Sequence, residues 1–330
     1  MAEVRPGVKL ETRQYGDPAT ASTLVVWGHG LCNTLVGEDK ERLWDFWATT
    51  RTRSSGGDAA AGTAEHGDAG RGRLGGDSAT HSLGASASDG GGAMHVVRYA
   101  ARGHGDSSPA SGPADCTWEA LGRDMLTLGL RARRVPEQRM VLGGASMGAA
   151  SAIWAAVHAH NDATAAAAAG GASSLPAPPS PLPPPPHVAG LVLVILPTFY
   201  DARTRRKGQI VKAAERGFEA MAGRTRIRGI FEGSPRESEP PKLIGVRKDS
   251  FKSVMLGGAD SDLPPPDVVA VAVASIPTLV LSWDCGDSTH PASSAAAFAE
   301  LAPHARVYIA RSLEDTAAWP GLIRDFVAGL

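Results

Sequence analysis

The segment Gly144-Ala145-Ser146-Met147-Gly148 has the residue types and the spacing of a nucleophilic serine held on a sharp turn. The apolar stretch Arg139–Gly143 before it predicts a buried strand, and the alanine-rich stretch Ala149–Ala159 after it predicts a helix. A serine between a strand and a helix has a strained backbone and an exposed hydroxyl, and the flanking glycines let neighbouring chain pass closely. The pattern G-x-S-x-G in this context predicts a nucleophile elbow, with an ordinary tight turn as the alternative.

Nucleophilic catalysis by a serine needs further groups. A serine hydroxyl attacks a carbonyl carbon when a base takes its proton, and imidazole suits this role because its pKa lies near the working pH. A carboxylate then orients the imidazole and stabilises its protonated form, while backbone N–H groups stabilise the oxyanion. The predicted helix after Ser146 offers such N–H groups at its first turn. This chemistry cleaves an ester, a thioester or an amide.

Short apolar segments alternate with helix-like segments and predict the elements that position the serine. The predicted strands are Ser22–Trp27, Met94–Tyr99, Arg139–Gly143, Gly190–Ile195, Thr278–Ser282 and Arg306–Ala310. The predicted helices are Cys116–Arg134, Ala149–Ala159, Ser293–Leu301 and Trp319–Ala328. Several strands are continuous runs of Val, Leu and Ile, as expected when helices cover both faces of a sheet. The alternation predicts an α/β fold with a mostly parallel sheet, and Val8–Tyr15 is expected to pair with Ser22–Trp27 as an antiparallel start.

Ligands of such sheets bind at the carboxyl ends of the strands, so the loops that follow the strands are the informative ones. Four of these loops are Gly28–Leu31, Arg102–Ser108, Gly144–Gly148 and Trp283–Pro291. Together they resemble the loops of the α/β-hydrolase family, which has a His-Gly turn, an Arg-Gly-x-Gly-x-Ser turn, a nucleophile elbow and a loop with the triad acid. The resemblance extends over nearly the whole predicted core and keeps the order of serine before aspartate.

The resemblance implies an α/β-hydrolase fold: a mostly parallel sheet flanked by helices, with a small helical cap. It implies that Ser146 is the nucleophile and that the backbone N–H groups of Leu31 and Met147 form the oxyanion hole. By its spacing to His290-Pro291, Asp287 matches the triad acid, and Asp284 is a weaker candidate. The branches of the fold that act on epoxides or halides have an aspartate at the nucleophile position, so the serine argues against them.

The general base departs from the family pattern. In the family this histidine lies in the loop after the last strand, but no histidine occurs from Ala305 to Leu330. His290 lies at the correct edge of the sheet, in the same loop as Asp287, and is the candidate base; alternatively it only begins the helix at Pro291. His29 and His104 are expected to shape their loops, with a smaller part in the site.

The sequence offers little support for other chemistries. Cys32 and Cys285 border the predicted pocket, either as small apolar filler or as a thiol nucleophile or redox pair. No set of His, Cys, Asp and Glu has metal-ligand spacing, and the glycines around Gly90–Gly92 lack the Gly-Lys-Ser/Thr of a phosphate loop, so no metal and no cofactor are expected. The basic clusters Arg131–Arg134 and Arg203–Lys207 are interpreted as solvated helix faces.

The bulk composition indicates a soluble globular protein. The 330 residues are 43% hydrophobic and 20% charged with a net charge of −1, which gives no reason to expect nucleic acid or an acidic membrane as partner. No apolar run approaches the ~18 residues of a membrane span, and no secretory signal is visible. Three widely spaced cysteines predict free thiols, so a cytoplasmic location is expected.

The chain is predicted to form a single domain over residues 1–330. Residues 51–92 are rich in small and polar residues, and residues 161–187 run from an alanine stretch into polyproline, so both are predicted to be inserts. Residues 199–265 are predicted to form the cap or lid. The polyproline is interpreted as a spacer, with a ligand for an SH3- or WW-type domain as the alternative.

Two functions follow from these observations. The first is a serine hydrolase (esterase or thioesterase) acting on a small acyl substrate through Ser146, Asp287 and His290. The second is a catalytically silent protein of the same fold that binds a small apolar ligand or a protein partner. The retained serine and glycines favour the enzyme, and the absence of a histidine after the last strand favours the binding protein. The sequence does not indicate an oligomeric state.

Overall fold

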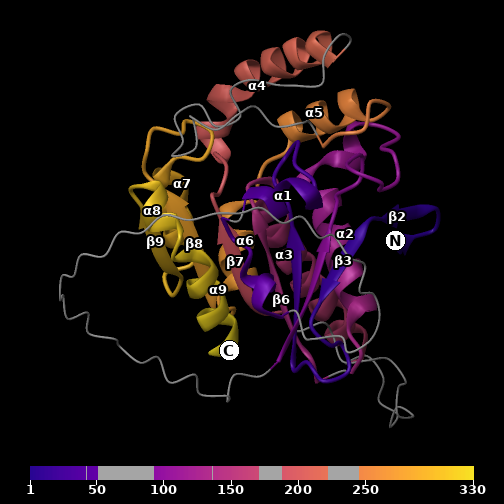
Figure 1. The fold of residues 1–330 in the computed structure, drawn as a ribbon, viewed down its shortest axis with the longest axis vertical. Coiled ribbons are helices and arrows are strands. Elements are labelled where there is room, and N and C mark those ends of the chain that lie inside the picture. The colour runs from indigo at the N-terminus through magenta and orange to yellow at the C-terminus, as the bar shows by residue number, and fades with distance from the viewer. Residues whose placement is uncertain (42, 51–92, 136, 171–187, 222–244) are drawn as a thin grey trace, which may run out of the picture.

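The computed structural model describes residues 1–330 apart from 42, 51–92, 136, 171–187 and 222–244 (Figure 1). The predicted insert at 51–92, most of the one at 161–187, and the middle of the predicted cap lie outside the described residues. The strands are β1 (Ala2–Arg5), β2 (Val8–Leu10), β3 (Thr12–Tyr15), β4 (Thr23–Gly28), β5 (Met94–Tyr99), β6 (Arg139–Ala145), β7 (Val188–Val194), β8 (Thr278–Trp283) and β9 (Arg306–Ala310).

The helices alternate with these strands. They are α1 (Leu35–Glu41), α2 (Trp118–Ala132), α3 (Met147–Gly170), α4 (Tyr200–Met221), α5 (Phe251–Asp260), α6 (Pro266–Val273), α7 (Ala292–Leu301), α8 (Leu313–Thr316) and α9 (Trp319–Ala328), with short 3₁₀ turns η1 (Phe46–Thr50) and η2 (Pro113–Cys116).

Seven strands form one sheet in the order β3-β5-β4-β6-β7-β8-β9, and β1 and β2 form a separate hairpin. Every neighbouring pair from β5 to β9 in this order is parallel, and β3 pairs with β5 antiparallel. The expected pairing of Val8–Tyr15 with the first parallel strand is therefore wrong. Strand β5 lies between β3 and β4, so β4 is an interior strand that is parallel to both of its neighbours, and the antiparallel β3 is at the edge.

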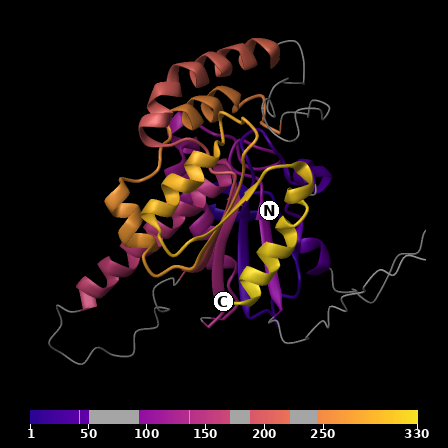
Figure 2. The ribbon, with the colours of Figure 1, turned by 90° about the vertical axis from the view of Figure 1, so that its left-hand side faces the viewer.

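Helices cover both faces of the sheet, and Figure 2 shows α7 and α9 on opposite sides of it. On one face α2, α3, α6 and α7 pack against alternate residues of the strands, such as Leu24, Val26 and Leu142. On the other face η1 and α9 pack against the intervening strand residues, such as Val25 and Trp27. Because successive strand residues point to opposite faces, burial of both sets explains the continuous apolar runs.

Helix α3 is longer than the sequence predicted. It continues through Gly170, so the first ten residues of the predicted insert at 161–187 are helical. The reason is the alanine run, since alanine has the highest helix propensity and loses no side-chain entropy in a helix.

Two glycines let the strands and α3 meet where the elbow is formed. A Cβ placed on Gly148 would lie 2.0 Å from the carbonyl oxygen of Gly28, and one on Gly144 would lie 2.3 Å from the same oxygen. The end of β4 therefore crosses the start of α3 at a separation that only glycine permits. This crossing brings the loop after β4 beside Ser146.

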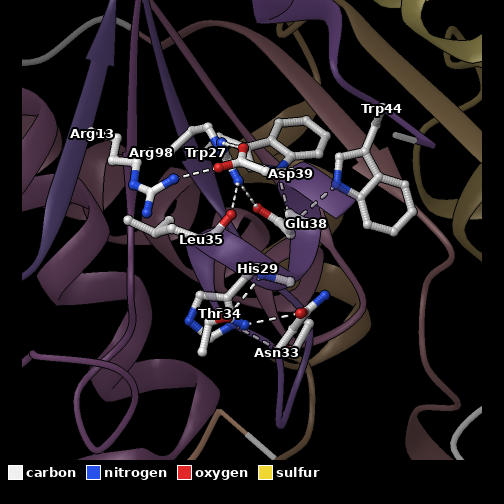
Figure 3. Close-up of polar contacts among 12 residues, drawn as sticks. Arg13, Trp27, His29, Asn33, Thr34, Leu35, Glu38, Asp39, Trp44 and Arg98 are labelled. Carbon is white, nitrogen blue, oxygen red and sulfur yellow. Dashed lines mark hydrogen bonds and ion pairs between the residues drawn. The ribbon is translucent and has the colours of Figure 1, made fainter. Parts of the chain in front are cut away.

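A buried ion cluster holds α1 against the sheet (Figure 3). The Arg98 guanidinium on β5 donates to Glu38 at 3.0 Å and to Asp39, and it lies over the Trp47 ring with 3.9 Å to the ring centroid. Glu38 also accepts the indole N–H groups of Trp27 and Trp44. Because buried charges need partners, these ion pairs and hydrogen bonds fix the segment that follows the Gly28–Leu31 turn.

Candidate active site

Ser146 lies at the turn between β6 and α3 with a backbone φ of 52°, in the left-handed region that non-glycine residues rarely adopt. Its N–H donates to the Val194 carbonyl at 2.9 Å, and its own carbonyl accepts from Ala150 N at 3.0 Å. The neighbouring strand and the first turn of α3 thus hold the strained residue in place. This is the backbone of a nucleophile elbow.

The Ser146 hydroxyl meets His290. Ser146 Oγ lies 2.7 Å from His290 Nε2, and His290 Nδ1 lies 2.9 Å from Asp287 Oδ2. Because an ionised carboxylate only accepts hydrogen bonds, Nδ1 carries the proton in the neutral ring and Nε2 accepts the serine hydroxyl. The structure therefore brings together the three side chains expected to form the triad, and it places two of them three residues apart in the loop after β8.

Asp287 is buried and accepts four hydrogen bonds. Oδ2 accepts the Trp283 indole N–H at 3.1 Å besides the His290 ring, and Oδ1 accepts the backbone N–H groups of Thr289 at 2.9 Å and His290 at 3.2 Å. Burial works to raise the pKa of Asp287, but the hydrogen bonds from His290, the charge of its ring and the backbone donors together hold this pKa below its usual value. The carboxylate is thus ionised and aimed at the imidazole.

The Gly28–Leu31 turn runs alongside the elbow. A Cβ placed on Gly30 would lie 3.7 Å from Ser146 Cβ, an ordinary van der Waals separation. Within the residues that the structure describes, neither Leu31 N nor Met147 N donates to another backbone group. Met147 is the first residue of α3, where backbone N–H groups have no partner inside the helix. Neither amide is therefore used up by the backbone of the described residues.

His29 fixes the orientation of the peptide that carries Leu31 N. Ala101 N donates to His29 Nε2 at 2.9 Å, so Nδ1 carries the proton and donates to the Gly30 carbonyl at 2.7 Å. In a trans peptide the C=O and the N–H point in opposite directions, so holding the Gly30 oxygen also directs Leu31 N–H. His29 shapes the loop, as expected, and both of its ring nitrogens are engaged away from Ser146.

His104 packs edge-on against His29, with 4.8 Å between the ring centroids. Burial, reinforced by the neighbouring His29, lowers the pKa of His104 to about 3, and burial also lowers the pKa of His29. Both rings are therefore neutral in the folded protein near neutral pH. The two rings pack together beside the Gly28–Leu31 turn and serve as structural groups rather than as acids or bases.

The loop after β9 holds no base, and its residues have other partners. Asp315 accepts the backbone N–H groups of Arg311 and Ser312, and Ser312 caps α8 in return. Asp284, the weaker candidate acid, is exposed, and its backbone N–H donates to the Ala310 carbonyl at 2.8 Å. The position where the family has its histidine is thus occupied by a helix cap.

Helices α4 and α5 lie together beyond the carboxyl ends of the strands (Figure 1). Gly258 on α5 faces the Leu31 side chain, and Cys32 Sγ lies 3.8 Å from Met255 Sδ. The loop between β7 and α4 touches the loop after β8, because Thr198 N donates to the Thr289 carbonyl at 3.0 Å. These contacts form an apolar and backbone-lined cover over the Ser146 side of the sheet.

Several residues of the site were not found from the sequence. Trp283 is the last residue of β8, and its hydrogen bond to Asp287 has no motif of its own. Arg203 was expected on a solvated helix face, but its side chain is buried and its guanidinium lies 4.0 Å from the Trp118 ring centroid. That interpretation is wrong for Arg203 and holds for the exposed Arg205 and Lys207.

The thiols and the metal-binding residue types add no second centre. Burial raises the pKa of Cys32 to about 12, and burial also raises the pKa of Cys285, so neither is a ready thiolate. Among the described residues, no cluster of three or more His, Cys, Asp and Glu side chains is arranged to hold a metal ion. In the same residues, no helix combines the length and the apolar character needed to cross a membrane.

Comparisons with known proteins bear on the fold. No protein-family model and no curated protein sequence matches the chain. Among solved structures, it is similar to a hydrolase from Pseudomonas aeruginosa PA01, at 19% identity over 98% of this chain and 95% of that one, with a TM-score of 0.54. An esterase from Exiguobacterium antarcticum matches at 13% identity over 98% and 96% of the two chains, with a TM-score of 0.58.

A thermophilic esterase from Thermogutta terrifontis is similar at 18% identity over 98% of this chain and 92% of that one, with a TM-score of 0.51. At such low identity these likenesses speak for the fold alone. The strand order, the elbow at Ser146 and the similarity over nearly the whole length of these hydrolases lead to one conclusion: the chain has the α/β-hydrolase fold.

Proposed function

We propose that this protein is a serine hydrolase that cleaves a small carboxylic ester or thioester. One observation carries the proposal: the Ser146 hydroxyl lies 2.7 Å from an imidazole nitrogen whose ring is oriented by a buried carboxylate. A serine held at a strained turn, with a base in hydrogen-bond reach and an acid behind it, is an activated nucleophile. An ordinary tight turn has no need of these partners.

In the first half of the reaction, Ser146 Oγ attacks the carbonyl carbon while its proton passes to His290 Nε2. Asp287 stays ionised and stabilises the imidazolium, and the Leu31 and Met147 amides donate to the oxyanion. Each such donor contributes about 3 kcal/mol to stabilising the transition state. His290 then gives the proton to the leaving oxygen or sulfur, and Ser146 remains acylated. In the second half, water loses its proton to His290 and attacks the acyl group, which releases the acid and restores the serine.

The surroundings support a small acyl substrate. The described part of residues 199–265 supplies α4 and α5, which we assign as the cap, and the Leu31 side chain packs against α5 at Gly258. The similar solved structures include hydrolases and esterases, which fits this assignment. All three cysteines are free, consistent with the cytoplasmic location that is part of the proposal.

The proposal is tested with a fluorophosphonate probe and with p-nitrophenyl butyrate. The wild-type protein is expected to be labelled at one residue and to hydrolyse the ester, and Ser146→Ala should abolish both. The matched control Ser111→Ala replaces an exposed serine outside the site and should keep both. A folded wild-type protein that is not labelled and does not turn over the ester would overturn the proposal and favour a ligand-binding protein of the same fold.

A further inference from the structure

The basic cluster Arg203–Lys207 of α4 divides between two faces of the helix. Arg205 and Lys207 are exposed, and Lys207 Nζ pairs with Asp260 at 2.7 Å. Arg203 and Arg206 are less exposed, and residues three apart lie on the same side of a helix. That side faces the body of the protein, because Arg203 reaches the carbonyl groups of Thr198, Gly258 and Ser261.

Arg203 is committed to the fold. Its guanidinium donates to these three carbonyl groups and stacks on the Trp118 ring. It thereby joins α4, the end of α5 and the loop before α4. Arg203 therefore anchors the turn of α4 that also carries Arg206.

Arg206 has a free donor. Its NH2 donates to Ser288 Oγ at 3.1 Å, whereas its NH1 is buried and has no hydrogen-bond partner. Over the described residues, this is the only terminal guanidinium nitrogen among the buried polar atoms that lack a partner. A buried N–H group without a partner is unfavourable, so a ligand that supplies an acceptor is favoured there.

The nearby carboxylates are engaged elsewhere. Asp262 accepts the backbone N–H groups of Tyr200 and Leu263, and Asp260 pairs with Lys207. In the described part of the chain, no ion pair to Arg206 is formed. Among the described residues, the half-buried Arg206 thus has no carboxylate partner for its charge and no acceptor for its NH1 donor.

The position of Arg206 connects it to the site. Ser288, which it contacts, lies between Asp287 and His290 in the triad loop. Two residues of extended chain span at most about 7 Å, so Ser288 and His290 are close neighbours. A group bound by Arg206 beside Ser288 would therefore lie next to the triad loop and apart from the carbonyl carbon that Ser146 attacks.

We propose that the substrate carries a carboxylate, remote from the scissile bond, that Arg206 binds. This inference rests on the proposed function and names its substrate class: a half-ester or thioester of a dicarboxylic acid, or an ester with an acidic leaving group. A carboxylate fits because its single charge matches one guanidinium, and its two oxygens match the planar edge of that group.

The kinetic test compares p-nitrophenyl esters of equal length with and without a carboxylate, such as the valerate and the half-ester of glutarate. The half-esters of succinate and adipate vary the distance. The wild-type protein should prefer a half-ester in kcat/KM. Arg206→Met should lower this preference by about tenfold or more, because a hydrogen bond to a charged group is lost, and Arg206→Lys should lower it less. The exposed neighbour Arg205→Met is the control and should keep the preference.

A binding test does not depend on turnover. Monomethyl glutarate should bind to the Ser146→Ala protein in calorimetry, and Ser146→Ala/Arg206→Met should lose this binding while keeping the thermal melting of Ser146→Ala. Two results would overturn the inference. One is a ratio of kcat/KM values for acidic and neutral esters that is the same in the folded wild-type and Arg206→Met proteins. The other is binding of monomethyl glutarate that survives the loss of Arg206. If the carboxylate binds through Arg206 but no ester is cleaved, the carboxylate site at Arg206 stands, while the proposed hydrolase function and the substrate class derived from it fail.

Discussion

Trp283 shows how a single side chain outside the predicted triad orients it. Its indole N–H donates to the same Asp287 oxygen that accepts the His290 ring, and its ring stacks on Trp319 with 6.0 Å between centroids. The hydrogen bond favours the ionised carboxylate and fixes the direction of the oxygen that holds the imidazole. Trp283 is thus a positioning residue that acts through Asp287.

We expect Trp283→Phe to lower kcat for a p-nitrophenyl ester by about three- to tenfold with little change in KM, because one donor to a charged acceptor is lost. Phenylalanine keeps a ring beside Trp319, so the melting temperature should change little. Steady-state kinetics check this, with Trp154→Phe as control, since that indole N–H donates to the Asp262 carbonyl at 2.8 Å instead. A wild-type kcat in Trp283→Phe would contradict the positioning role of Trp283 and show that the other hydrogen bonds to Asp287 are enough to orient it.

At the scale of elements, the position of α1, which follows the Gly28–Leu31 turn, depends on a buried ion pair. Arg98 on β5 and Glu38 on α1 have side chains that are fully buried, and the pair joins an element next to the site to the sheet. Such a pair adds little stability over apolar residues, but removing one partner leaves the other charge buried without compensation.

Glu38→Gln should lower the free energy of unfolding by about 3 kcal/mol, since the glutamine keeps the shape and removes the charge. Urea unfolding at neutral pH measures this, and Glu300→Gln on the exposed side of α7 is the control. A loss of less than about 1 kcal/mol, typical of an exposed pair, would contradict the importance given to this cluster.

For the whole molecule, the buried neutral histidines link stability to pH. His29 and His104 have lowered pKa values in the folded protein, about 3 for His104, while an unfolded histidine titrates near 6.5. The unfolded chain therefore binds more protons between these pH values, so their contribution to stability is present above pH 6.5 and is lost as the pH falls from there towards 3. The lowered pKa values of His95 and His158 act in the same direction.

For each buried histidine that stays neutral in the folded protein, the free energy of unfolding should fall by about 2 kcal/mol as the pH is lowered from 7.5 to 5. Urea midpoints at the two pH values measure the loss, and His104→Gln should reduce it by the share of one histidine. A stability that stays flat over this range, or the same slope in His104→Gln, would show that His104 is protonated in the folded protein.

Much of the fold could be predicted from the sequence because both faces of the central sheet are covered. Continuous apolar runs mark such strands well, and the buried β5 has the predicted bounds. The pairing of β3 with β5 could not be predicted, since the two are separated by a long stretch of chain and only the sheet order decides the partner. The burial of Arg203 was missed for a similar reason, because its carbonyl partners come from two segments far apart in the sequence, the loop before α4 and the end of α5.

For the site, the elbow glycines and the order of Ser146 and Asp287 carry a local signal, while the base does not. His290 has the sequence context of a helix start, with α7 beginning at Ala292, and only the folded loop brings its ring to Ser146. The four hydrogen bonds to Asp287 that shape this loop include two from backbone N–H groups, which no residue type reveals.

The most direct test of the triad is the acylation rate of His290→Ala. The rate of the p-nitrophenol burst is measured for the wild-type protein, for His290→Ala, and for His304→Ala, whose exposed histidine binds the Ile276 carbonyl away from the site. Loss of the base should slow acylation by about 100-fold or more in His290→Ala, while His304→Ala stays at the wild-type rate. A folded His290→Ala protein that acylates Ser146 at the wild-type rate would contradict the assignment of His290 as the base.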